Sequence, residues 1–187
     1  MSTPPTSLKK NHMKISPART ADSSLASPYE TENDILVATR IELNRLMNQR
    51  LSDIIDLQLQ LKQAHWNVKG PSFISLHELF DETYVTVTSY VDLIAERIAQ
   101  LGGIAEGTVR TAAARTHLAE YPLAIGEGPA HIEAVARALS TFGREARTMI
   151  GEADELDDAG TADLFTEISR GIDKALWFVE AHGQARS

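Results

Sequence analysis

The chain has 187 residues, of which 43% are hydrophobic and 24% charged, as expected for one globular domain with a core of its own. It has no cysteine, which excludes disulfides, thiolate metal ligands and cysteine nucleophiles. No apolar run approaches the roughly 18 residues of a membrane span and no signal peptide is recognisable, so we expect a cytoplasmic protein with no membrane partner.

The net charge of −8 is unevenly distributed along the chain. Residues 1–28 have a balance of +3, which leaves −11 for the remainder. The basic residues of this segment are Lys9, Lys10, Lys14 and Arg19, and its one acid is Asp22. Because residues 1–30 are also rich in Ser, Thr and Pro and show no helical period, we expect them to form a flexible basic tail. The helical spacing of apolar residues in the rest of the chain predicts a folded helical body over residues 31–187.

A long first helix is expected over about residues 33–68, where apolar residues recur at steps of three and four. Thr31 and Asp34 resemble a capping pair at its start. Gly70-Pro71 ends the helical pattern.

A second helix is expected over about residues 73–101, capped by Ser72 or Ser75 and stopped by Gly102-Gly103. Its segment TYVTVTSYV (83–91) is rich in β-branched and aromatic residues, which favour strands. The apolar residues nevertheless keep helical steps throughout, and we therefore predict a helix.

Residues 104–126 are a long connection with one short helix expected near RTAAAR. A third helix starts at Pro129, a favourable first-turn residue, and a fourth spans about residues 161–181 and is closed by Gly183. The long connection lets the third helix run parallel to the second. The short links between the first and second helices and between the third and fourth make each of these pairs antiparallel. The sequence thus predicts an all-α four-helix bundle with one long crossover, the ferritin-like arrangement.

The segment HWNVKGPSFISLHELFD (65–81) places two imidazoles and a carboxylate in an otherwise buried helical pattern. His77 and Asp81 are four residues apart and share one face of the second helix. His65 lies near the end of the first helix, just before the tight turn, so it can reach the same pair.

Asp92 and Glu96 form a second pair with the same spacing on the second helix. At 1.5 Å per residue, Asp81 and Asp92 are about 16 Å apart along the axis, which is too far for one metal ion. If this helix packs antiparallel on its copy in a second subunit, the His77 end of one copy meets the Glu96 end of the other. An isologous dimer does this twice, and we therefore predict two equal metal sites at a dimer interface.

Imidazole nitrogens together with several carboxylates suit Fe(II), Zn(II), Mn(II) or Co(II) better than Cu(I), and such a shell also accommodates Fe(III). These residue types leave the choice among these metals open, and Zn or another divalent ion is an expected occupant of the isolated protein. The competing interpretation is that the histidines are hydrogen-bonded within the protein and the acids are solvated, with no metal. It is adequate for any one of these residues, but it explains poorly why all five occur in this pattern.

The two motifs HWNVKGPSFISLHELFD and VDLIAERIAQLGG resemble the signatures of the Dps family, the DNA-binding proteins from starved cells or mini-ferritins. The resemblance covers residues 31–182. It implies a hollow homododecamer that oxidises Fe(II), preferably with hydrogen peroxide, stores the ferric mineral inside and protects DNA from oxidative damage. The ferroxidase ligands that it implies, position by position, are His65, His77, Asp81, Asp92 and Glu96.

Trp66 and Lys62 lie next to these ligands and are candidates for a role in the same chemistry. The resemblance implies that Trp66 lies near the iron and traps stray oxidising equivalents, and an interface tryptophan is the alternative. Lys62 lies one turn before His65, where it can compete with metal for the carboxylates, and a surface lysine is the alternative.

An acidic run, GEADELDDAGTADLFTE (151–167), begins where the third helix ends, and negative charge there opposes the helix dipole. A solvated loop is one interpretation of this run. The resemblance implies acidic pores at this link of the shell. Asp158, Asp163 and Glu167 step by five and four residues, and we take them as the set that lines a three-fold pore for incoming Fe(II).

The basic tail supports a second hypothesis, a nucleoid-associated protein that compacts DNA without sequence preference. Its four basic residues, displayed on twelve subunits, would give avidity from weak phosphate contacts, although the acidic body repels DNA and a solubilising or assembly arm is the alternative. Truncation of residues 1–28 should abolish compaction and spare iron oxidation.

A di-iron site within one bundle is disfavoured, because it needs Glu-x-x-His pairs and no histidine of this chain follows Glu by three residues. The remaining histidines, His12, His117, His131 and His182, show no convincing carboxylate pattern. Trp177 fits a core or an interface better than a functional site.

Overall fold

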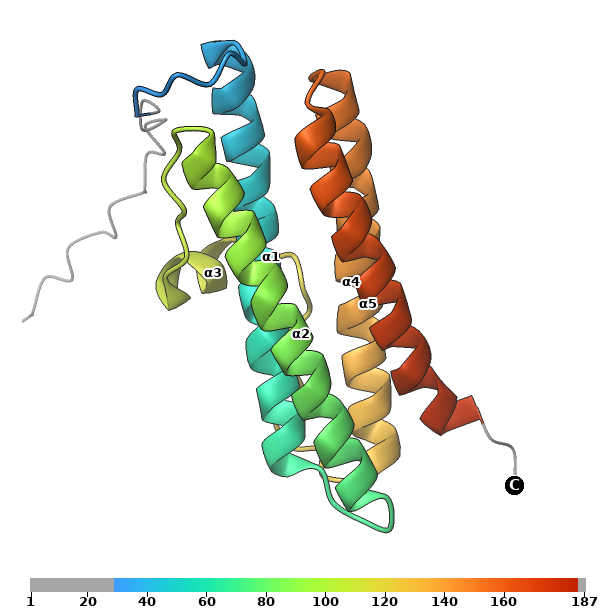
Figure 1. Ribbon diagram of the computed structural model, residues 1–187. Coiled ribbons are helices and arrows are strands. Elements are labelled where there is room, and N and C mark those ends of the chain that lie inside the picture. Colours follow the sequence, from blue (N-terminus) through green and yellow to red (C-terminus); the bar gives the residue numbers. More distant parts are fainter. Residues whose placement is uncertain (1–28, 185–187) are drawn as a thin grey trace, which may run out of the picture.

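The computed structural model describes residues 29–184, and these form five helices. The helices are α1 (Val37–Asn67), α2 (Phe73–Gln100), α3 (Val109–Arg115), α4 (Gly128–Glu155) and α5 (Ala159–Gln184). Figure 1 shows two antiparallel pairs, α1 with α2 and α4 with α5, packed side by side. Since α4 runs parallel to α2 after the long crossover, the predicted ferritin-like four-helix bundle is confirmed for the chain.

The core is a continuous apolar layer between the two pairs. Phe80, Phe142 and Phe165 are fully buried at its centre, one from each of α2, α4 and α5. Leu43, Met47 and other apolar residues of α1 complete it. No helix of the described part is long and apolar enough to cross a membrane.

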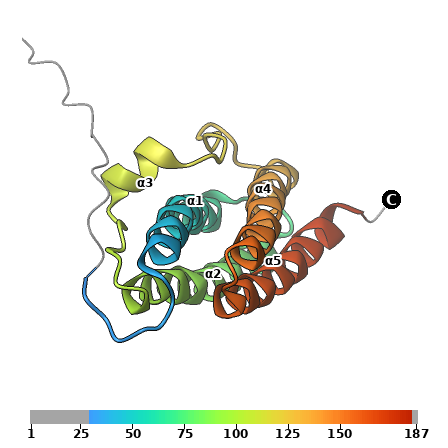
Figure 2. The same cartoon turned by 90° about the horizontal axis from the view of Figure 1, so that it is seen from above.

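The crossover that carries α3 lies outside the bundle against α1, as the view from above shows (Figure 2). Polar side chains of α1 hold it there by bonding to its backbone. Asn48 Nδ2 donates to the Ile104 carbonyl at 3.0 Å, and Gln49 Nε2 donates to the Arg115 carbonyl at 2.8 Å. Further along, Gln60 Nε2 reaches a carbonyl of the crossover at 3.0 Å. One face of α1 therefore packs into the core while another satisfies backbone groups of a non-helical segment.

The segment 83–91 is helical despite its β-branched residues, as predicted. Thr83, Thr86 and Thr88 each donate their hydroxyl to the backbone carbonyl four residues earlier, at distances from 2.7 to 3.1 Å. These bonds satisfy the hydroxyls inside the helix, so this stretch carries no unmet polar group that would favour a strand.

The predicted caps of the first two helices are wrong in detail. Helix α1 begins at Val37 with Leu36 at the N-cap position and has no side-chain cap, and Thr31 Oγ1 accepts from the Asn33 amide before the helix begins. Ser72 stands at the N-cap position of α2, but its side chain makes no capping bond. Helix α5 begins at Ala159 and continues through Gly183 to Gln184, so Gly183 does not close it.

Candidate metal centre

Two histidines face each other across the turn between α1 and α2. The rings of His65 and His77 stack with centroids 3.7 Å apart and planes at 22°. Nδ1 of each ring lies 2.8 Å from the backbone carbonyl oxygen of the other residue. A carbonyl only accepts, so each Nδ1 must carry the proton and donate it. Nε2 is then the nitrogen of each ring that has the lone pair when the ring is neutral, and it is the atom that can bind a metal cation.

Asp81 lies one turn beyond His77, with 44% of its side chain exposed, and forms an ion pair with Lys62. The ammonium group of Lys62 also sits 4.5 Å from the centroid of the Tyr84 ring. The hydrogen bond from Lys62 lowers the pKa of Asp81, and the charges of Lys62 and the two histidines act in the same direction. Asp81 is thus a carboxylate already paired with a cation of the chain itself.

Asp92 and Glu96 are exposed on α2, about 16 Å along its axis from Asp81. Within residues 29–184, no group of three or more His, Asp or Glu side chains comes close enough to hold a metal ion. The fold thus brings His65 to His77 and Asp81 to Lys62, and it leaves Asp92 and Glu96 apart from both. One chain presents two partial ligand sets at opposite ends of one helix.

Large apolar side chains surround the histidine end of α2. Trp66 is 64% exposed and Ile74 is 59% exposed, and the ring of Phe73 lies 5.1 Å from that of His77. Sequence reasoning singled out Trp66 but missed Phe73 and Ile74, whose place in the first turn after Gly70-Pro71 was the available signal. An exposed apolar cluster of this kind is typical of a surface that another chain covers.

Asp158 does not fit the pore that the sequence suggested for it. Its side chain is 4% exposed and accepts two bonds from Nη2 of Arg97, at 2.9 and 2.8 Å. It also accepts from the Thr161 hydroxyl at 2.5 Å and from the backbone amides of Gly160 and Thr161. Asp158 therefore caps the start of α5 and ties it to the end of α2. Asp163 and Glu167 are exposed on α5 and remain candidates for a pore.

The pKa of Asp158 reflects the same contacts. Burial opposes its ionisation, but the hydrogen bonds from Thr161 and Arg97 outweigh burial and lower the pKa.

The predicted DNA-binding residues Lys9, Lys10, Lys14 and Arg19 lie outside the described residues.

Known proteins share both the sequence and the architecture. A family model described as a ferritin-like domain matches residues 44–185. A DNA protection during starvation protein from Agrobacterium fabrum (strain C58 / ATCC 33970) is 40% identical over 159 residues, 85% of this chain and 98% of that protein. The chain belongs to the Dps family of ferritin-like proteins.

Solved Dps structures have the same fold. DpsC from Streptomyces coelicolor superposes with a TM-score of 0.82 at 27% identity, over 86% of this chain and 94% of that one. DpsA14 from Streptomyces coelicolor gives 0.78 at 34% identity, over 86% of this chain and 98% of that one. The Dps family is thus supported by sequence and by structure independently.

We expect Lys62→Met to strengthen binding of a divalent metal, since the ion no longer has to displace an ammonium group from Asp81. Because exposed ion pairs are weak, the effect should be modest, a fall in the dissociation constant of up to about fivefold. Zinc titration calorimetry at neutral pH measures this without redox chemistry. The acid limb of zinc binding should also shift to higher pH, because the pKa of Asp81 rises. Lys69→Met, at an exposed lysine nearby, is the matched control, and unchanged or weaker binding in Lys62→Met would contradict this role.

We expect Asp158→Ala to destabilise the protein by about 2–3 kcal/mol, since it removes a cap and leaves Arg97 without its partner. Asp158→Asn keeps the acceptor oxygen and should cost less. The pKa of Asp158 is lowered on folding, so its contribution is present above the unfolded value near 3.8 and disappears as pH falls through the folded value. Urea unfolding at neutral and acidic pH measures both effects, and equal stability of the wild type and Asp158→Ala would refute the capping role.

Proposed function

We propose that the protein oxidises Fe(II) at sites shared between two subunits and stores the ferric product in a shell of such subunits. The observation that carries this proposal is the reciprocal bonding of His65 and His77, which turns both Nδ1 atoms to the backbone and keeps both Nε2 atoms as possible metal ligands, one helical turn from Asp81. Membership of the Dps family supports the same reading.

The second half of each site would come from a neighbouring subunit. Antiparallel packing of α2 on its copy brings Asp92 and Glu96 of one chain to His65, His77 and Asp81 of the other. The exposed apolar residues Trp66, Phe73 and Ile74 supply a surface for such a contact. A two-fold axis repeats the arrangement, so each dimer would contain two sites.

Iron is the substrate in this proposal. Two Fe(II) ions and one hydrogen peroxide, with two protons, give two Fe(III) ions and two water molecules. Because peroxide accepts both electrons at one site, hydroxyl radical is not released. The neutral imidazoles hold Fe(II), and the three carboxylates balance the additional charge of Fe(III). Lys62 moves off Asp81 when the metal binds, and it returns when the metal leaves.

The ferric product would collect inside a dodecameric cage, the assembly implied by the family resemblance. Fe(II) would reach the interior through acidic pores, for which Asp163 and Glu167 are the candidates. They are exposed, four residues apart and on one face of α5. Removal of Fe(II) and peroxide together would protect DNA, which agrees with the names of the relatives. Non-specific DNA compaction through the basic tail remains the alternative, and it depends on residues that the structure does not describe.

The proposal predicts fast oxidation of Fe(II) by peroxide on the assembled protein. The oligomer is loaded anaerobically with Fe(II), given a stoichiometric pulse of hydrogen peroxide, and passed over a sizing column. We expect oxidation well above the rate for free iron, with the iron eluting on a particle of about twelve chains. Both effects should be lost in His65→Ala/Asp92→Ala.

A matched variant separates loss of ligands from loss of surface residues. His182→Ala/Glu180→Ala removes one histidine and one acid that are exposed on α5 and should behave like the wild type. An intact shell that oxidises iron no faster than buffer would contradict the proposal and leave tail-dependent DNA compaction as the main hypothesis.

A further inference from the structure

A buried tyrosine and a buried histidine form a pair that the proposed metal centre does not use. Tyr121 comes from the crossover and His131 from the first turn of α4. The hydroxyl of Tyr121 lies 2.6 Å from Nδ1 of His131, and the two rings are 6.0 Å apart at 28°. Tyr121 is 7% exposed and His131 is fully buried. No carboxylate takes part in this contact, so the pair is not the usual acid–histidine couple.

The protonation states of the pair follow from its burial. Burial lowers the pKa of His131, and the backbone of Asn67 opposes this only in part. The imidazole is therefore neutral and accepts the phenol proton in a hydrogen bond. Burial also raises the pKa of Tyr121, so the phenol does not ionise by simple acid dissociation. The proton between them can move to the histidine only if the tyrosine gives up an electron at the same time.

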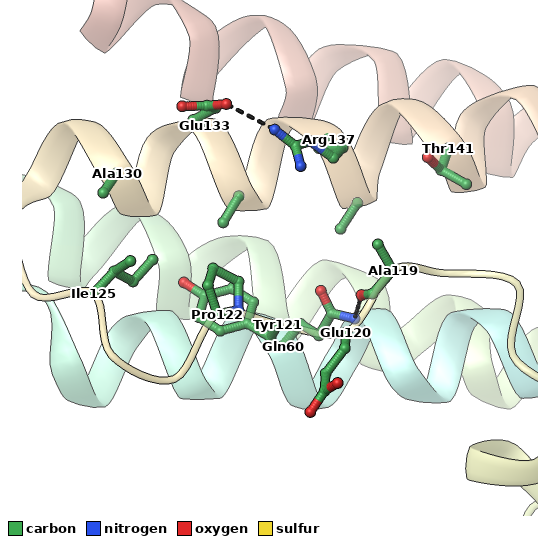
Figure 3. Close-up of a pocket in the computed structure, with 12 residues that line it drawn as sticks. Gln60, Ala119, Glu120, Tyr121, Pro122, Ile125, Ala130, Glu133, Arg137 and Thr141 are labelled. Atoms are coloured by element: carbon green, nitrogen blue, oxygen red, sulfur yellow. Dashed lines mark hydrogen bonds and ion pairs between the residues drawn. The ribbon is translucent and has the colours of Figure 1, made fainter.

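The pair lies near the end of α1 that also carries His65. His131 is close to the backbone of Asn67, the last residue of α1, which directly follows Trp66. On the other side, Tyr121 lines a cavity of about 170 Å³ between the crossover, α1 and α4, beside Gln60 and Pro122 (Figure 3). The pair thus lies between the histidine end of α1 and a cavity that can admit a small solute.

We propose that Tyr121 and His131 form a proton-coupled redox site, which removes oxidising equivalents that escape the two-electron reaction. This inference rests on the proposed function for the source of the oxidant. When one Fe(II) alone meets peroxide, it gives Fe(III), hydroxide and hydroxyl radical. Tyr121 then loses one electron, the hydroxyl radical becomes hydroxide, and the phenol proton moves to Nδ1 of His131. The products are a neutral tyrosyl radical and a protonated histidine.

The histidine is what makes this step favourable. Without an acceptor, loss of an electron would leave a cation radical in a buried site, which is costly because charge is poorly solvated there. With His131 at 2.6 Å the proton stays within the pair and is available for return. A one-electron reductant of the thiol or ascorbate class in the cavity would restore the phenol. The proton then moves back from the histidine, and the reductant is left oxidised by one electron.

The experiment uses the full, assembled chain at one Fe(II) per site, where one-electron chemistry is favoured. Peroxide is added, and samples frozen within milliseconds to seconds are examined by electron paramagnetic resonance. We expect a tyrosyl radical in the wild type that is lost in Tyr121→Phe and retained in Tyr90→Phe, the control at another buried tyrosine. In His131→Gln the radical yield should fall several-fold and the g-tensor should shift, because the protonated imidazole no longer bonds the radical oxygen.

A second experiment tests whether the radical forms at Tyr121 without iron. Photogenerated ruthenium(III) tris-bipyridine oxidises the metal-free protein, and the same radical should form at Tyr121. If the wild type oxidises iron but no radical at Tyr121 forms in either arm, this inference is overturned and the ferroxidase proposal stands. If the light-driven radical forms at Tyr121 but iron is not oxidised, the redox pair is supported and the ferroxidase proposal fails. A purely structural hydrogen bond would lower stability in Tyr121→Phe without any change in the radical signal.

Discussion

The length of α2 is the constraint on which the rest of this structure depends. A single helix carries four of the five expected ligands, and its rise keeps Asp81 and Asp92 about 16 Å apart whatever the surrounding residues are. The chain therefore cannot gather the set on its own, and the described residues contain no metal-binding cluster. The remaining ligands of each proposed site must therefore come from a second chain. The exposed apolar residues at the histidine end of α2 are consistent with a surface that a second chain covers.

Helix α1 stabilises this arrangement because it contacts both the apolar core and the crossover. Its apolar face packs into the core, while Asn48, Gln49 and Gln60 bond the backbone of the crossover. These bonds hold a long non-helical segment against the bundle, so the chain can return to the far end and start α4 parallel to α2. The same segment positions Tyr121 beside His131, and so the crossover is also what brings the buried redox pair together.

The helices could be predicted from the sequence because they depend on local spacing, and the same spacing is the basis on which the ligand candidates were chosen. Steps of three and four identified α2 correctly even through residues 83–91, where β-propensity argued for a strand. The roles of Asp158 and His131 could not be predicted in this way. Arg97, the partner of Asp158, is 61 residues away, and Tyr121 reaches His131 from a different element. Spacing along the chain cannot distinguish a buried cap from a pore-lining acid, since tertiary contacts decide it.

The most direct test of the shared site is complementation between two inactive variants. Chains with His65→Ala/His77→Ala are assembled together with chains carrying Asp92→Ala/Glu96→Ala, and peroxide-driven Fe(II) oxidation is measured on the mixed particles. If each site draws ligands from two subunits, random pairing restores about a quarter of the sites, because each mixed dimer contains one complete site. Activity near a quarter of the wild type, from two inactive parents, is the expected result. Mixed particles as inactive as their parents, with assembly unchanged, would contradict a centre shared between subunits.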